Sequence, residues 1–98
     1  EEDLNEIVEY IALDSVSAAL RVAEQIERKL NLLAGQPLLG NRVTMEELVS
    51  MNYRYIVVGN YIAFYVVEER TVVVHRILHG ARDYTRVLLA DKAPDSQQ

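Results

Sequence analysis

The chain has 98 residues; half of them are apolar, none is cysteine, and the formal charge is −5. This length suits a single domain with one core, and the absence of cysteine excludes disulfides, thiolate metal sites and a cysteine nucleophile. The acidic balance disfavours direct binding to DNA, and no apolar run approaches the roughly 18 to 20 residues that a bilayer span needs, so we expect a cytoplasmic protein without membrane contact.

The first third of the chain predicts two consecutive amphipathic helices. Apolar residues recur at helical spacing over residues 1–13 and again over 16–34. Asp14, Ser15 and Ser17 are candidate N-caps for the second helix. Because almost no linker separates the two helices, we expect an antiparallel hairpin. The second helix is expected to end at Gly35, in the left-handed conformation, and at Pro37, which cannot continue a helix.

A loop over residues 35–51, with a helical turn at 46–49, leads into a β half. Three strands are predicted, over residues 53–58, 61–67 and 71–78, because β-branched and aromatic residues dominate there. Gly59 and Asn60 form a two-residue loop with glycine first, as a type II′ turn requires. Residues 68–70 form the second turn, which gives a three-stranded antiparallel meander.

These elements predict an α+β fold with the helical hairpin on one face of the sheet. Both faces of the middle strand are apolar: Ile62, Phe64 and Val66 point one way, and Tyr61, Ala63, Tyr65 and Val67 the other. We therefore expect another chain, or a segment outside this sequence, to cover the second face. The alternative is cover by residues 84–89 of the chain itself. The domain is predicted to span 1–90, followed by a polar, disordered tail over 91–98.

Several kinds of chemistry are absent from the sequence. The four glycines are scattered, so no phosphate-binding or dinucleotide-binding loop is formed. His75 and His79 are expected on the same face of a strand but about 13 Å apart, too far for one metal ion. No serine stands in a nucleophile elbow. No cofactor and no metal are predicted.

The stretch "RILHGARDY" at the end of the third strand contains the candidate functional residues. His79, Arg82 and Tyr84, together with Arg54, combine donors for phosphate or carboxylate, a group that titrates near neutral pH and an aromatic ring. Such a set suits metal-independent RNA cleavage or a protein-binding edge. The structural alternative is that Gly80 ends the strand and Asp83 caps a final helix. Arg76 is expected to be paired or snorkelling, and His75 to be a satisfied strand histidine.

The helix "EEDLNEIVEYI", the loop "LLAGQPLLG" and the segment "YRYIVVGNYIAFYVVEERTVVVHRILHGARDY" resemble the ParE/RelE toxins of bacterial type II toxin–antitoxin systems. The resemblance covers residues 1 to about 90. It implies that a first strand of the family, absent here, precedes the first helix. It also implies a cognate antitoxin that covers apolar surface, which we assign to Ile62, Phe64 and Val66.

The superfamily divides by target, and this sequence is closer to ParE. RelE-like members cut mRNA on the ribosome, whereas ParE-like members have the same scaffold and inhibit DNA gyrase by binding. Arg82 matches an arginine of the nucleases, but Ile62 and Leu88 stand where active nucleases usually have an arginine and a late tyrosine. The resemblance thus implies a gyrase inhibitor whose target contacts are Arg54, His79, Arg82 and Tyr84. The alternatives are a nuclease that uses these four residues for catalysis and an inactive member kept for antitoxin binding.

Overall fold

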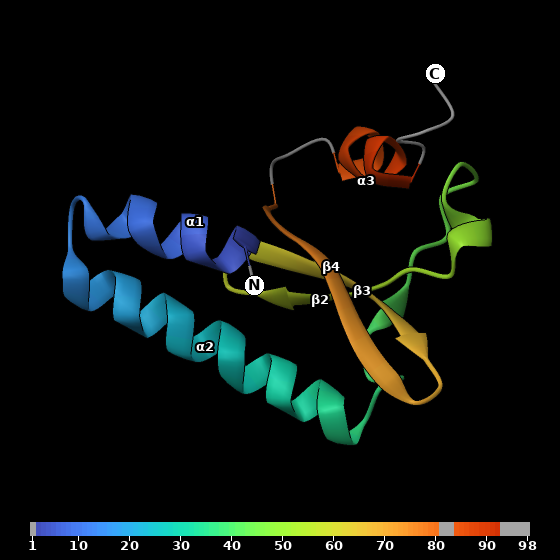
Figure 1. Ribbon diagram of the computed structural model, residues 1–98, viewed down its shortest axis with the longest axis horizontal. Helices are drawn as coiled ribbons and strands as arrows, with labels where there is room; N and C mark the ends of the chain where they lie inside the picture. The colour runs from blue at the N-terminus through green and yellow to red at the C-terminus, as the bar shows by residue number, and fades with distance from the viewer. Residues whose placement is uncertain (1, 81–83, 93–98) are drawn as a thin grey trace.

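The computed structural model describes residues 2–80 and 84–92, and it has an α+β architecture (Figure 1). Its elements are α1 (Glu2–Ala12), α2 (Val16–Gly35), β1 (Asn41–Arg42), a 3-10 turn (Val49–Met51), β2 (Arg54–Val58), β3 (Tyr61–Glu68), β4 (Thr71–His79) and α3 (Tyr84–Lys92). The strands form one antiparallel sheet in the order β1-β2-β3-β4. The predicted fold class is confirmed. The described residues contain no helix long and apolar enough to cross a membrane.

The two ends of α2 are capped differently from each other. Ser15 is the N-cap, as predicted: its Oγ accepts a hydrogen bond from the amide of Ala18 at 3.2 Å. The predicted left-handed cap at Gly35 is wrong, because Gly35 is the last helical residue and Gly59 is the one glycine described with positive φ. The Gln36 amide instead donates to the carbonyls of Leu32 and Leu33, so backbone groups alone close this end.

The two hairpin turns of the sheet differ in chemistry. Gly59 has φ 59° and Asn60 is not left-handed, which matches the predicted type II′ turn. The second turn has two residues rather than three, because β3 continues through Glu68 and β4 begins at Thr71. Glu69 and Arg70 have φ 51° and 71°, both left-handed. Neither side chain favours this conformation, which costs about 1 to 2 kcal/mol per residue.

The predicted loop over residues 35–51 contains a strand, so the sheet has four strands and not three. In β1, Asn41 pairs with Tyr55 and Arg42 with Arg54. Two polar residues carry no strand pattern, and this strand forms because the edge of β2 is available for pairing. Residues 46–48 form a turn, as predicted, and a 3-10 helix follows directly at Val49–Met51.

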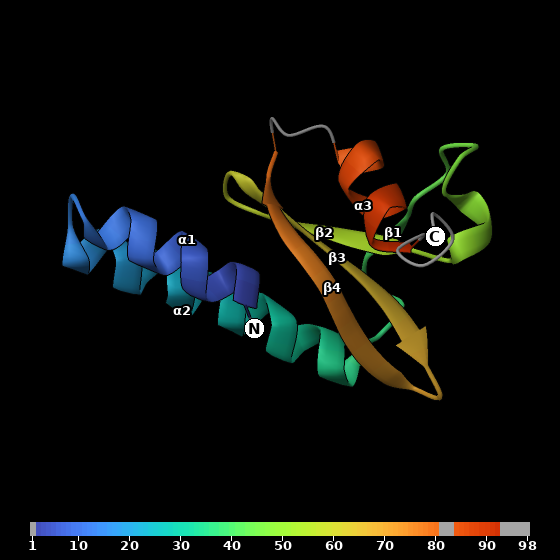
Figure 2. The same cartoon turned by 45° about the horizontal axis from the view of Figure 1, so that its top comes forward.

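Two clusters of buried side chains lie on opposite faces of the sheet. The first is formed by the hairpin against the sheet and contains Leu4, Ile26, Leu33, Ile56, Val58, Ala63, Tyr65 and Ile77. The second contains Val43, Leu48, Tyr53, Phe64, Val66, Leu78 and Leu88. The predicted facing of β3 is therefore confirmed. In the described chain this face is covered from within, as the alternative expected, because α3 and residues 43–53 supply apolar side chains to the second cluster. Figure 2 shows α3 on the side of the sheet away from the hairpin.

The C-terminal helix extends past the predicted domain boundary at residue 90. α3 continues to Lys92, two residues into the predicted tail. Residues 93–98 and the predicted helix cap Asp83 lie outside the described residues. Gly80 has the structural role considered for it, since it directly follows β4 and its amide donates to the Asn60 carbonyl at 2.8 Å. This bond ties the end of β4 to the turn between β2 and β3.

Candidate functional site

The predicted site residues do not converge in the structure. Arg54 begins β2 and pairs with Tyr65, whereas His79 ends β4 and pairs with Tyr61, four residues earlier in β3. At about 3.4 Å per residue this places them at least 13 Å apart. Arg82 lies outside the described residues. The set therefore does not form one catalytic centre among the described residues.

Arg54 and Tyr84 each hold another segment of the chain in place. The Nη1 of Arg54 donates to the Gly40 carbonyl at 2.8 Å and to the Leu38 carbonyl at 3.3 Å. The ring of Tyr84 packs on Phe64 with a centroid separation of 4.9 Å and is half-buried. Arg54 thus holds the loop that follows α2, and Tyr84 anchors α3 on the second core. His79 is exposed at the end of β4.

The two histidines of β4 lie on opposite faces, contrary to the prediction. A bulge shifts the register of β4, because Phe64 pairs with Arg76 and the next residue, Tyr65, pairs with Val74. Consequently Val74 and Ile77 both pack on the first core although they are three residues apart. His75 packs edge-on against Tyr53 of the second core, and His79 packs edge-on against Tyr61 of the first.

A cleft of about 270 Å³ lies between α1 and β4, next to the predicted residue His79. Its lining residues are Asp3, Glu6, Ile7 and Tyr10 from α1, Tyr61 from β3, and Arg76, Ile77, Leu78 and His79 from β4. The ring of His79 meets that of Tyr61 at 5.6 Å and 84°. Sequence reasoning missed the α1 contribution, because no local pattern shows that Asp3 and Arg76, 73 residues apart, are neighbours.

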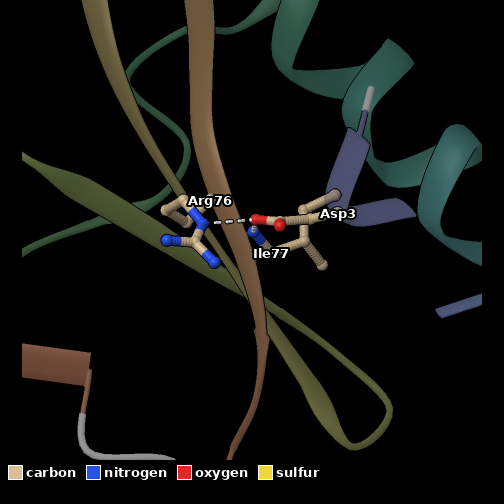
Figure 3. A network of polar contacts seen from close by, with 3 residues as sticks. All are labelled: Asp3, Arg76 and Ile77. Carbon is tan, nitrogen blue, oxygen red and sulfur yellow. Dashed lines mark hydrogen bonds and ion pairs between the residues drawn. The ribbon is translucent and has the colours of Figure 1, made fainter. Parts of the chain in front are cut away.

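Asp3 lines this cleft and joins α1 to β4 (Figure 3). Its Oδ2 accepts a hydrogen bond from the Nε of Arg76 at 2.7 Å and another from the backbone amide of Ile77 at 2.8 Å. The side chains are 13% and 28% exposed for Asp3 and Arg76. The expectation that Arg76 is paired is confirmed.

The charges of the cleft suit a protein partner better than a phosphate. The guanidinium of Arg76 is matched by Asp3, and Glu6 adds a second carboxylate, so the lining has a formal charge of −1 with neutral histidine. An anionic phosphodiester is disfavoured there, whereas exposed tyrosine and histidine rings suit a protein surface. No group of three or more His, Asp or Glu side chains within the described ranges is arranged to hold a metal ion.

Residues 1–84 match the family model described as the ParE toxin of the type II toxin–antitoxin system parDE. The chain belongs to the ParE toxin family. It is therefore a toxin of a type II toxin–antitoxin system, and a cognate antitoxin is its implied partner. No curated protein matches the sequence significantly.

The two positions at which the resemblance implies an arginine and a tyrosine in the nucleases are apolar and packed in this ParE family member. Ile62 is half-buried against the second core, and Leu88 is fully buried within it. Neither position presents a donor or a proton-transfer group. The match to ParE confirms the family resemblance read from the sequence.

Proposed function

We propose that this ParE family toxin inhibits DNA gyrase by binding, and that its cognate antitoxin neutralises it. The observation that carries the proposal is the ParE match over residues 1–84. Packing supports it, because Ile62 and Leu88 occupy the nuclease positions as core side chains. Charge supports it too, because the cleft beside His79 has no excess cation for RNA.

Within this proposal, the predicted target contacts divide into direct and supporting residues. His79 is exposed at the sheet end, and Arg82 follows three residues later in the chain, so we assign direct contact to these two. Arg54 and Tyr84 act through the loop and the helix that they hold in place. If Arg54 and Tyr84 contributed to stability alone, substituting either residue would lower the free energy of unfolding and leave the affinity of the folded protein for gyrase unchanged.

The proposed antitoxin contacts lie under α3. Phe64 and Val66 are buried, 1% and 7% exposed, in the cluster that contains Leu88. An antitoxin segment that contacts them must take the place of α3 on the sheet. We therefore expect the amides of α3 to lose protection from hydrogen exchange when antitoxin binds, and retained protection would contradict this assignment.

The test of the target is a supercoiling assay with purified gyrase and the full chain. We expect inhibition that rises with toxin and saturates near stoichiometry. His79→Ala should raise the half-inhibiting concentration about 5- to 30-fold, the loss typical of one interface hot spot. His75→Ala, the same change on the opposite face, should leave it unchanged. Unaltered supercoiling at stoichiometric excess of toxin would refute the proposal.

A further inference from the structure

The tip of the helical hairpin bears an apolar patch that nothing in the described chain covers. The patch, here called the tip patch, consists of Tyr10, Leu13, Val16 and Leu20, which are 77%, 84%, 63% and 62% exposed. These values are high for large apolar side chains that stand within eleven residues of sequence, around the turn between α1 and α2. Contiguous exposed apolar surface of this kind marks an interaction site more often than chance.

The position of the hairpin explains why the tip patch is exposed. The hairpin reaches well beyond the sheet, and its connecting turn lies at the far end from the strands (Figures 1 and 2). The residues that dock it on the sheet come from the other half of each helix, with Leu4 of α1 and Ile26 and Leu33 of α2 in the first core. The sheet therefore leaves the last turn of α1 and the first turns of α2 uncovered.

Helical spacing places the patch residues together. Val16 and Leu20 are one turn apart on α2, so their side chains are neighbours on one face. Leu13 lies in the short connection just before α2. Tyr10 lies one turn before the connection and also lines the cleft beside His79. The tip patch is therefore continuous with the cleft that contains the proposed target contact.

The charge around the tip patch restricts its occupant. Residues 6–28 contain five carboxylates and two guanidinium groups, a formal charge of −3, with Glu24 paired to Arg28 at 3.9 Å. The carboxylates are all exposed: Glu6, Glu9, Asp14, Glu24 and Glu27. Such a rim repels nucleic acid and an anionic membrane surface, and it would face the same acidic rim in a second copy of this chain. It attracts a protein surface with apolar anchors ringed by lysine or arginine.

We infer that the tip patch and its acidic rim form the main docking surface for the toxin's target protein, which presents apolar side chains within a basic rim. This inference rests on the proposed function, because it names the surface by which the bound target is held. The cleft with His79 and the tip patch are then adjoining parts of one interface, joined through Tyr10. The centres of protein interfaces are typically depleted in charge and rich in aromatic and aliphatic side chains, and the tip patch has this composition.

The experiment introduces charge at the centre of the patch in the full chain. Leu13→Glu combined with Leu20→Glu should abolish growth arrest on expression and raise the half-inhibiting concentration for gyrase at least tenfold. Thermal unfolding should be unchanged, since both side chains are mostly exposed. The matched control is Leu38→Glu, an equally exposed leucine outside the tip, which should behave like the natural chain.

A second pair of variants tests the rim without touching the apolar residues. Glu9→Lys with Glu27→Lys should weaken gyrase inhibition at least threefold at low salt, and the difference should narrow as salt rises. Glu46→Lys with Glu47→Lys makes the same change in net charge in an exposed loop and should leave inhibition unaltered. Equal weakening by both pairs would overturn the role of the rim.

The outcomes separate this inference from the proposed function. If the natural chain arrests growth but leaves gyrase unaffected, the proposed target fails, and the tip patch is judged on growth arrest alone. Arrest that persists in the Leu13 and Leu20 double variant, or that is also lost in Leu38→Glu, overturns the inference. Persistent arrest combined with lost rescue by antitoxin would assign the patch to the antitoxin instead. A natural chain that neither arrests growth nor inhibits gyrase overturns both.

Discussion

The strongest stability prediction concerns Asp3, which fixes the start of α1 to the edge strand β4. Its carboxylate accepts hydrogen bonds from the Arg76 guanidinium at 2.7 Å and from the Ile77 amide at 2.8 Å. Hydrogen bonds to a charged group contribute about 1.5 to 3 kcal/mol each, and partial exposure favours the low end of that range. We expect Asp3→Ala to lower the free energy of unfolding by about 2 to 3 kcal/mol. In a domain of this size, that loss lowers the melting temperature by about 10 °C.

Two further variants show whether the charge or the acceptor oxygen matters more. Asp3→Asn keeps an oxygen for the Ile77 amide but loses the ion pair, so we expect a loss of about 1 kcal/mol. Glu6→Ala removes an exposed carboxylate one turn further along the same helix and should change stability by less than about 0.5 kcal/mol. Urea unfolding followed by circular dichroism measures all three. A loss below about 0.5 kcal/mol for Asp3→Ala would show that the hydrogen bonds of Asp3 to β4 do not stabilise the fold.

Three further predictions concern the loop after α2 and the strained turn. Tyr65→Phe should cost about 1 to 3 kcal/mol in urea unfolding, because its buried hydroxyl donates to the Pro37 carbonyl and accepts from the Gly40 amide; an unchanged midpoint would contradict this. Gly40→Ala should also destabilise by at least about 1 kcal/mol, since its Cβ would lie 2.5 Å from the Tyr65 hydroxyl, and a neutral result would show that the loop moves freely. Glu69→Asn with Arg70→Gly should raise the free energy of unfolding by about 1 to 2 kcal/mol, and with it the melting temperature, because both positions have a left-handed backbone. A lower melting temperature would contradict the assignment of strain to this turn.

The regular parts of the fold were predictable because local chemistry determines them. Helical spacing of Leu4, Ile26 and Leu33 specifies the face that the hairpin buries, and Ser15 specifies where α2 begins. The alternation along β3 gave the correct face for each of its core residues. Glycine at position 59 determined the first turn, since it is the residue that best tolerates the required positive φ.

The features that sequence reasoning missed depend on contacts between distant segments. β1 consists of two polar residues and exists because β2 offers an edge for pairing. The turn at Glu69 and Arg70 is left-handed without glycine or asparagine, so the flanking strands impose it. The bulge that moves His75 and His79 to opposite faces has no signal in the strand pattern.

The candidate site was predicted only in part, for the same reason. His79 at the end of β4 lines a cleft whose second wall comes from α1 and not from Arg54 or Tyr84. Arg54 and Tyr84 have polar or aromatic groups that suit a target, and their chemistry alone does not reveal that the loop and the second core already use them. Burial and pairing, which arise from the whole fold, decide which functional groups are available.

The central claim is that this ParE family toxin acts on DNA gyrase by binding. The most direct test is to express the chain under tight control in bacterial cells and to follow DNA and protein synthesis separately by pulse labelling. We predict that DNA synthesis falls first, with filamentation and a DNA-damage response, while protein synthesis continues. An early collapse of protein synthesis, with mRNA cut at the ribosomal A site, would contradict the claim and make the residues around His79 candidates for catalysis.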